Sequence, residues 1–374
     1  MMQRICFLYI DEPYNIYHSI SIAIALHQDS NSEVQILCTP RNFVYVSNIL
    51  KDEGTTDLNV HIIRPFWYIT LPHYLEIKLQ HRYFLYKKYG KLLSDFDGIV
   101  CSLYNDLTLR KFIGDKPQLI FAGHGIANRS YSYDDKIKGF DYILLAGENE
   151  KSIRESLGQL IEGKYLITGY PKYDICENVD CVSPFQNEKP IVFYNPHWLK
   201  EYSSFYSHGI QILKSFSKQQ DYNLIFAPHS LLITRNQSIL SEINSFEKFS
   251  QIHIDTGSIH CHNMNYIKLS DIYLGDISSQ ALEFALVKNR PCLFVVHNKN
   301  EINSKEFHSL AFGKIIDSVE NLADELSSIT EDFNSKYHSI QSKEIPKLFY
   351  HSNKKASQIA STGITKYLSN GKKI

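Results

Sequence analysis

Short apolar runs alternate with helical stretches along most of the chain. The first series of strand candidates covers residues 4–10, 33–39, 59–63, 98–102, 118–122, 142–146 and 165–168. A second series covers residues 191–195, 223–227, 251–255, 272–275 and 292–296. Many of these runs are apolar throughout, which is typical of parallel strands that helices cover on both faces. The pattern therefore predicts an α/β protein with two doubly wound parallel sheets.

The segment between the two series has the composition of a linker. Residues 169–190 carry Pro171, Pro184 and Pro190 among several polar residues. We therefore expect one Rossmann-like domain over residues 1–175, a second over residues 176–345, and a helical tail over residues 346–374. A length of 374 residues fits two domains of ordinary size.

Composition and charge exclude several classes of protein. Hydrophobic residues make up 43% of the chain and charged residues 21%, which excludes wholesale disorder. The 39 Lys and Arg residues against 40 Asp and Glu leave a net charge of −1, so we expect no nucleic-acid partner. The seven Cys show no zinc-site spacing, and no signal peptide or spanning run of about 20 apolar residues is visible. We expect a cytoplasmic protein with reduced thiols, no metal site and no cofactor.

Polar residues follow four of the predicted strands at the point where each strand ends. Ligands of doubly wound sheets bind beyond these carboxyl ends, so the residues there are candidates for binding and catalysis. The candidates are His124, His197, His229, and the group of Asp276, Ser278 and Ser279.

The segment after residues 272–275 has the features of a phosphate site. Ser278 and Ser279 can cap the helix that follows, and the N–H groups and dipole at a helix start attract an anion. Glu283 lies one turn further along, where a carboxylate can accept both hydroxyls of a ribose. His229 can donate to a second phosphate. Together these residues predict a site for a nucleoside diphosphate, without the GxGxxG or Walker loop that the sequence lacks.

His124 is the candidate general base. It lies between two glycines, which allow a substrate to approach closely. An imidazole titrates near neutral pH and can therefore accept a proton from a hydroxyl group. Three carboxylates could orient it, Asp106, Asp134 or Asp135, and the sequence does not choose among them.

Five motifs in the same order resemble those of one known family. They are GHGI at 123–126, GYPKYD at 169–174, YNPHW at 194–198, APHS at 227–230 and SDIYLGDISSQALEFALVKNRPCLFV at 270–295. Read together, they resemble the CDP-glycerol glycerophosphotransferase family of teichoic-acid synthesis. The resemblance implies a GT-B-like fold, in which two Rossmann-like domains face a cleft, with the acceptor on the N-terminal side and the nucleotide donor on the C-terminal side.

The resemblance also implies roles for individual residues. His124 would be the base, and His229 with Lys172 would hold the donor pyrophosphate. Ser278 and Ser279 would bind phosphate, Glu283 would bind the ribose, and His197 and Asp276 complete the expected donor site. The chain departs from the family pattern at four positions, Ile126 in place of Thr, Lys172 in place of Arg, His197 in place of Thr and Ser230 in place of Pro. These departures leave the acceptor and the transferred group open.

Residues 65–91 mix aromatic and basic side chains, including Trp67, Tyr83, Lys87 and Lys91. Such a stretch is suited to an anionic bilayer or to a lipid-linked acceptor, or else it is a core-packing helix with a solvated basic face. The first interpretation predicts peripheral contact with the inner face of the cell membrane.

The sequence thus predicts a transferase that moves glycerol phosphate, or a similar polyol phosphate, from a CDP-activated donor to an acceptor hydroxyl. The acceptor would be a lipid-linked or polymeric molecule in cell-surface polymer synthesis. The alternative within the same fold is a GT-B glycosyltransferase that uses a nucleotide sugar for capsule or lipopolysaccharide assembly. A non-catalytic nucleotide-binding protein and a nucleotide-sugar epimerase are further alternatives.

Overall fold

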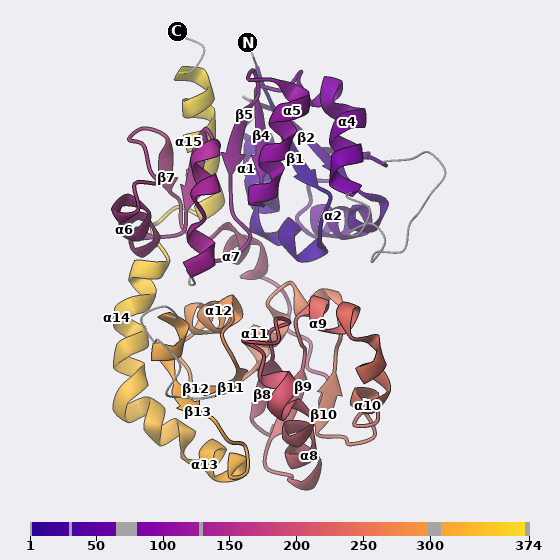
Figure 1. The fold of residues 1–374 in the computed structure, drawn as a ribbon, viewed down its shortest axis with the longest axis vertical. Coiled ribbons are helices and arrows are strands. Elements are labelled where there is room, and N and C mark those ends of the chain that lie inside the picture. Colours follow the sequence, from indigo (N-terminus) through magenta and orange to yellow (C-terminus); the bar gives the residue numbers. More distant parts are fainter. Residues whose placement is uncertain (1, 30–31, 65–80, 127–129, 298–307, 371–374) are drawn as a thin grey trace. The chain divides into compact units, whose positions relative to one another are not determined.

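The computed structural model describes residues 2–29, 32–64, 81–126, 130–297 and 308–370. The chain forms two compact units, each built on one parallel sheet (Figure 1). The first unit contains residues 1–126, 133–178 and 347–374, and the second contains residues 127–132 and 179–346. The predicted α/β class with two parallel sheets is confirmed. The C-terminal segment, expected as a separate tail, belongs to the first unit by its contacts.

The first sheet has the strand order β3-β2-β1-β4-β5-β6-β7, with every neighbouring pair parallel. Its strands are β1 (Gln3–Tyr9), β2 (Ser32–Cys38), β3 (Asn59–Ile62), β4 (Gly98–Cys101), β5 (Gln118–Phe121), β6 (Tyr142–Leu145) and β7 (Tyr165–Ile167). The order reverses between β1 and β4. In an open α/β sheet, the carboxyl ends of the two strands at such a reversal flank the usual ligand crevice.

Seven α-helices and three short 3-10 helices accompany the first sheet within the described residues, and a fourth 3-10 helix, η3 (Ser130–Tyr133), lies across the border between the two units. The α-helices are α1 (Ile20–Gln28), α2 (Pro40–Asp52), α4 (His81–Leu93), α5 (Arg110–Ile113), α6 (Glu148–Ser156), α7 (Pro171–Cys176) and α15 (Ala356–Asn370). The 3-10 helices are η1 (Pro13–His18), η2 (Tyr104–Leu109), η3 (Ser130–Tyr133) and η4 (Asp135–Gly139). Thr39 caps α2, because its hydroxyl oxygen accepts the N–H of Asn42 at 3.4 Å. The helical pattern over residues 13–28 is divided at Ser19 into η1 and α1.

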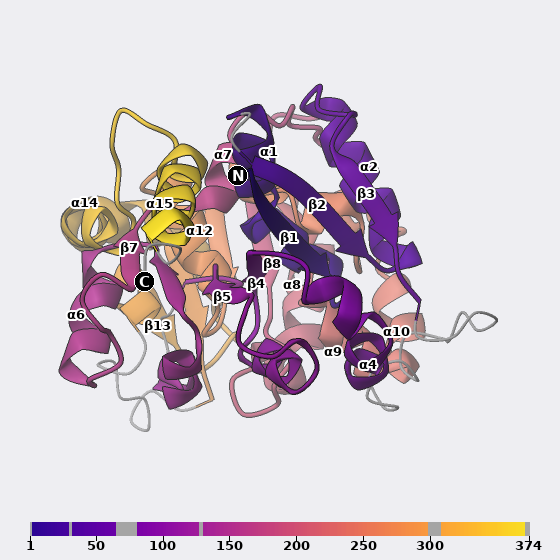
Figure 2. The same cartoon turned by 90° about the horizontal axis from the view of Figure 1, so that it is seen from above.

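Helix α15 closes the first unit by packing along α1 and β6 (Figure 2). The Gln3 side-chain amide donates to Thr365 O at 3.0 Å, and the rings of Tyr142 and Tyr367 stack at 4.4 Å between centroids. Helix and sheet approach so closely that a Cβ at Gly363 would lie 2.3 Å from Leu166 Cδ2. The C-terminal helix is therefore part of the core packing of this unit.

The second sheet has the strand order β10-β9-β8-β11-β12-β13, again parallel throughout. Its strands are β8 (Ile191–Asn195), β9 (Asn223–Phe226), β10 (Ile252–Ile254), β11 (Ile272–Gly275), β12 (Cys292–Val295) and β13 (Lys314–Ile316). The order reverses between β8 and β11. This reversal marks the expected ligand edge of the second sheet.

The second unit carries α8 (Ile210–Lys218), α9 (Ser230–Arg235), α10 (Leu240–Asn244), α11 (Asn265–Leu269), α12 (Ser279–Val287), α13 (Leu322–Asp332) and the greater part of α14 (His338–Leu348). The short helices are the π-helical turns η5 (Phe205–Gly209) and η10 (Phe333–Tyr337) and the 3-10 helices η6 (Gln237–Ile239), η7 (Ile259–Cys261) and η9 (His308–Phe312). Side chains of adjacent strands, such as Val192, Leu224 and Leu274, are fully buried in one apolar core. This burial explains why the strands appear in the sequence as continuous apolar runs.

The aromatic and basic stretch at 65–91 is described only in its second half, and Trp67 lies outside the described residues. In α4, Tyr83, Phe84, Lys87 and Lys91 are exposed. Across the described residues, every helix falls short of the length and apolar character that crossing a bilayer would need.

Candidate active site

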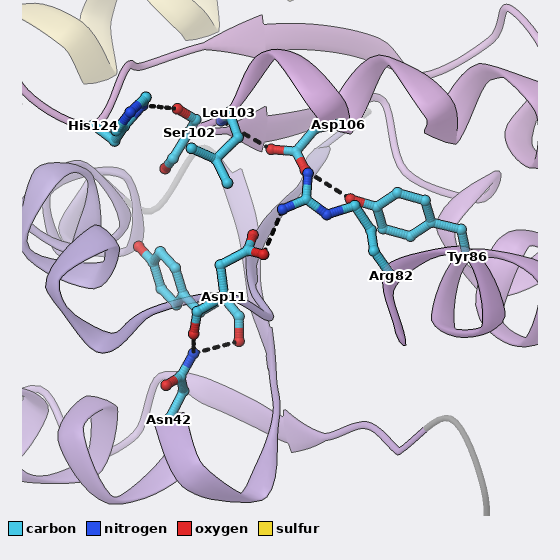
Figure 3. A network of polar contacts seen from close by, with 9 residues as sticks. Asp11, Asn42, Arg82, Tyr86, Ser102, Leu103, Asp106 and His124 are labelled. Atoms are coloured by element: carbon cyan, nitrogen blue, oxygen red, sulfur yellow. Dashed lines mark hydrogen bonds and ion pairs between the residues drawn. The ribbon is translucent and has the colours of Figure 1, made fainter. Parts of the chain in front are cut away.

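His124 follows β5 in a turn that only glycines can build easily. Gly123 and Gly125 on either side have φ values of 72° and 141°, in the region that disfavours other residues. The imidazole Nδ1 lies 2.9 Å from the carbonyl oxygen of Ser102, which follows β4 (Figure 3). Because a carbonyl only accepts hydrogen bonds, Nδ1 carries the proton in this arrangement. The lone pair of the neutral ring is then on Nε2, as a general base requires.

The surroundings of His124 favour the neutral imidazole. The side chain reaches solvent, yet the protein atoms packed around it desolvate the imidazolium, and this desolvation lowers the pKa of His124 below its ordinary value. The hydrogen bond to Ser102 and the charge of Asp106 act in the opposite direction. Since desolvation dominates, His124 is unprotonated at neutral pH.

Of the three carboxylates that could orient His124, the structure connects Asp106 to it. Asp106 accepts the N–H of Leu103 at 3.0 Å. This N–H belongs to the same peptide group as the Ser102 carbonyl oxygen, which accepts the hydrogen bond from His124 Nδ1. Asp134 is bonded instead to Lys136, and Asp135 to the side chain of Gln159. The position of Asp106 in the sequence favours it over the other two carboxylates, because it follows β4, which is the neighbour of β5 in the sheet.

Lys172 lies in the same unit as His124, at the start of α7, and is buried. A buried histidine, His18 at the end of η1, lies close enough for the charge of Lys172 to affect it. The Tyr170 hydroxyl lies 3.4 Å from His18 Nδ1. The pKa of His18 is lowered, first by burial and then by the charges of Lys172 and His124. Three basic side chains thus lie near one another, and His18 is, with His197, an alternative candidate for the base.

Asp276 is engaged by protein groups at the carboxyl ends of β8 and β11. Its carboxylate has no exposed surface, and each of its two oxygens lies 3.0 Å from the backbone nitrogen of His197, which donates its N–H to them. One of them also accepts the Ser204 N–H at 2.7 Å and the Ser204 hydroxyl at 2.9 Å. Asp276 therefore fixes the loop after β8. The contact of Asp276 with the donor stays a prediction.

His197 and His229 lie together, with ring centroids 5.8 Å apart, and share one hydrogen-bond pattern. His197 Nδ1 accepts the N–H of Leu199, and His229 Nδ1 accepts the N–H of Leu231, each at 3.2 Å. A nitrogen that accepts a backbone N–H carries no proton, so the proton of each neutral ring is on Nε2. These two histidines are therefore set up as donors, whereas His124 is set up as an acceptor.

The start of α12 has the predicted cap. The Ser278 hydroxyl accepts the N–H of Gln280 at 3.3 Å, and Ser279 begins the helix. Glu283 is inside this helix with only 2% of its surface exposed. Ser278 is only two residues from Asp276, which is hydrogen-bonded to His197. The start of α12 therefore lies near His197, at the carboxyl ends of β8 and β11.

Trp198 and Arg235 were not identified from the sequence. The Arg235 guanidinium lies over the Trp198 ring at 4.1 Å from its centroid, and the same ring is 6.4 Å from that of His229. Trp198 directly follows His197, so its place after a strand was the available signal. Among the residues described, no group of three or more His, Cys, Asp or Glu side chains is arranged to hold a metal ion.

Solved structures with the same fold cover nearly the whole chain. The wall teichoic acid polymerase TagF has a TM-score of 0.65 at 14% identity, over 100% of this chain and 90% of that one. The S. aureus MnaA–UDP complex has a TM-score of 0.64 at 15% identity, covering 98% and 97%. UDP-GlcNAc 2-epimerase from Neisseria meningitidis, bound to UDP-GlcNAc, has a TM-score of 0.61 at 12% identity, covering 98% and 100%. At these identities the likeness establishes the fold, which is GT-B-like as predicted.

A comparison with curated protein sequences finds no match. Residues 119–364 match the family described as CDP-glycerol:poly(glycerophosphate) glycerophosphotransferase, which confirms the family expected from the motifs. The match covers most of the chain and includes His124, His197, His229 and the start of α12. The chain therefore belongs to the CDP-glycerol:poly(glycerophosphate) glycerophosphotransferase family, a family of transferases.

Proposed function

We propose that this protein transfers glycerol phosphate from CDP-glycerol to a hydroxyl group of a growing polymer. The acceptor oxygen forms a bond to the phosphorus next to glycerol, the bond from that phosphorus to the bridging oxygen breaks, and CMP leaves. The structural observation that carries the proposal is the set of hydrogen-bond partners of three histidines, from which the position of each ring proton follows. His124 presents a lone pair, while His197 and His229 present N–H donors.

His124 Nε2 would take the proton of the acceptor hydroxyl as the new bond forms. Its pKa, lowered by desolvation, keeps the ring ready to accept that proton at neutral pH. The two glycines around it leave room for the acceptor chain.

On the donor side, His197 and His229 would donate through Nε2 to phosphate oxygens, and the N–H groups at Ser278 and Ser279 would bind a phosphate at the start of α12. Glu283 would accept the ribose hydroxyls. Lys172, near His124, would stabilise negative charge on the transferred phosphoryl group. Asp276 would act indirectly, through the loop that it fixes.

Calorimetry with CDP-glycerol tests the donor proposal, with CMP, UDP-GlcNAc and GDP as comparison ligands. We expect CDP-glycerol and CMP to bind and a CDP-glycerol-dependent release of CMP when a poly(glycerophosphate) acceptor is added. Ser278→Ala and Glu283→Gln should each lose a contact of roughly 1.5–3 kcal/mol and weaken binding about 10- to 100-fold. Binding of UDP-GlcNAc in place of CDP-glycerol would favour a glycosyltransferase instead.

Thr39→Ala is the matched control for Ser278→Ala. It removes the cap of α2 in the first unit, which costs about 1 kcal/mol of stability without touching α12. Nucleotide affinity should stay at the wild-type value in this variant. Unchanged affinity in both Ser278→Ala and Glu283→Gln would place the nucleotide elsewhere.

We also propose that the acceptor is lipid-linked and that α4 contacts the inner face of the cell membrane. Lys87 and Lys91 are exposed on α4, and each Lys near an anionic surface contributes about 1 kcal/mol. Lys87→Glu/Lys91→Glu should reduce sedimentation with anionic vesicles at low salt by at least tenfold, whereas Lys218→Glu/Lys343→Glu, at exposed sites of the second unit, should not. Equal sedimentation of the wild type with neutral and anionic vesicles would contradict membrane contact.

A further inference from the structure

The peptide between Ser102 and Leu103 connects a carboxylate to the candidate base. Its carbonyl oxygen accepts the proton of His124 Nδ1 at 2.9 Å, and its N–H donates to Asp106 Oδ2 at 3.0 Å (Figure 3). The two bonds are made by opposite sides of one amide group. A continuous chain therefore runs from carboxylate through peptide to imidazole.

The carboxylate in this chain is held by several donors. Asp106 is 5% exposed, and besides the Leu103 N–H it accepts the hydroxyl of Tyr86 at 2.6 Å. The Arg82 Nη1 atom lies 3.2 Å from the same carboxylate oxygen. Burial raises the pKa of the Asp106 carboxyl, whereas the charge of Arg82 and the two hydrogen bonds, from Tyr86 and from the Leu103 N–H, favour its ionised form.

Arg82 also ties this carboxylate to the end of β1. Its guanidinium pairs with Asp11 as well as with Asp106, and Asn42 of α2 donates to the main-chain oxygen of Asp11 at 2.8 Å. Burial works against the charged guanidinium, but the two carboxylates outweigh it and raise the pKa of Arg82. The cluster fixes Asp106 between the two strands at which the sheet order reverses.

A charge at one end of a hydrogen-bonded chain strengthens the other bonds in it. A carboxylate at the N–H of a peptide draws electron density toward the carbonyl oxygen, which then accepts a hydrogen bond more strongly. In this site the strengthened bond is the one from His124 Nδ1. Its effects are to retain the proton on that nitrogen and to make Nε2 more basic.

We propose that Asp106 is the positioning residue of His124 and acts through the Ser102–Leu103 peptide. It fixes the ring with its proton on Nδ1 and increases the basicity of Nε2. This inference rests on the proposed function, in which His124 is the base of the transfer reaction. It assigns a role to a carboxylate that does not touch the imidazole.

Four charged or titratable side chains lie close enough to affect the pKa of His124 or of the nearby His18. Asp106 raises the pKa of His124 and Arg82 lowers it, while His18 and Lys172 face the same region from η1 and α7. Removing the charge of Asp106 therefore lowers the pKa of His124. The same change weakens the bond that holds the Nδ1 proton.

Nitrogen-15 NMR of histidine-labelled protein tests the inference without an activity assay. The wild-type His124 signal, assigned by its absence in His124→Gln, should show a protonated Nδ1 and an unprotonated Nε2 at pH 7.5. In Asp106→Asn the pKa of His124 should fall, and signals of the tautomer with its proton on Nε2 should appear in the spectrum. A wild-type ring protonated on Nε2 would overturn the inference, whether or not any variant folds.

Asp141→Asn is the matched control. Asp141 likewise accepts a backbone N–H, that of Leu119 at 2.7 Å, and pairs with Arg110, but it precedes β6 at the opposite end of the strands. It should lose a comparable amount of stability with no change in the His124 signals. Equal His124 signals in the wild type, Asp106→Asn and Asp141→Asn would overturn the role of Asp106.

Kinetics give the second test. Asp106→Asn should lower kcat by about 10- to 100-fold at the pH plateau, as other residues that orient a functional histidine do, with KM for the donor unchanged. The acidic limb of its pH profile should move to lower pH, and Asp141→Asn should retain the wild-type profile. Wild-type kcat in Asp106→Asn would contradict the inference. A wild type that transfers nothing from CDP-glycerol would instead contradict the proposed function, and the NMR result would stand by itself.

Discussion

His124→Ala should lower turnover by about 10²- to 10⁴-fold, the usual contribution of a general base. Donor affinity should change little, because the groups expected to bind the nucleotide, apart from Lys172, belong to the second unit. The wild-type rate should also fall only at pH values below 6.5, since the pKa of His124 is lowered from that ordinary value and a base is inactive once protonated. Transfer from CDP-glycerol, measured against pH, and calorimetry of the donor check both parts.

The control for this variant is His27→Ala. His27 pairs with Asp57 on the surface of the first unit, so its removal tests for nonspecific effects of losing a histidine. It should keep wild-type turnover. Near-wild-type turnover in His124→Ala would mean that the base is another residue, and His18 or His197 would be tested next.

His229→Asn should weaken donor binding by roughly 10- to 100-fold and lower kcat as well. A phosphate contact from Nε2 acts in the ground state and the transition state, and losing one is worth roughly 1.5–3 kcal/mol. Asn is the better replacement than Ala because it keeps a side-chain acceptor for the Leu231 N–H at the start of α9. Stability should therefore stay close to wild type, which thermal unfolding measures.

The contrast between the two variants distinguishes their roles. A loss of rate alone in His124→Ala and a loss of both rate and affinity in His229→Asn would support a base and a donor contact, respectively. If His229→Asn changed the rate but left the donor dissociation constant intact, His229 would not bind the ground-state phosphate.

Twelve of the strands were predictable because each is an apolar run between turn residues. Their observed ends agree within about two residues with the predicted ones. Strand β13 was not predicted, although β7 and β10 are equally short. The break at Ser19 was missed because apolar residues on both sides of it, Ile16 and Ile20, fit one continuous helix.

The candidate site was predictable in its positions but not in its protonation. His124, His197 and His229 follow strands, and parallel strands bring their carboxyl ends to one edge of a sheet. The proton positions depend on partners such as Ser102, which lies in a different connection of the same sheet. The hydrogen bonds of Asp276 to Ser204 were likewise not predictable, since these two residues are far apart in the sequence and are brought together only by the fold.

The packing of α15 affects how the protein can fold during its own synthesis. Residues 356–370 cover α1 and β6, so the first unit lacks part of its core until these residues have left the ribosome. The second unit, whose strands lie between residues 191 and 316, can complete its sheet earlier. N-terminal domains usually fold first during synthesis, but here the second unit can complete its sheet before the first unit completes its core. A nascent chain stalled before residue 356 would present an incomplete first unit, a natural substrate for a chaperone.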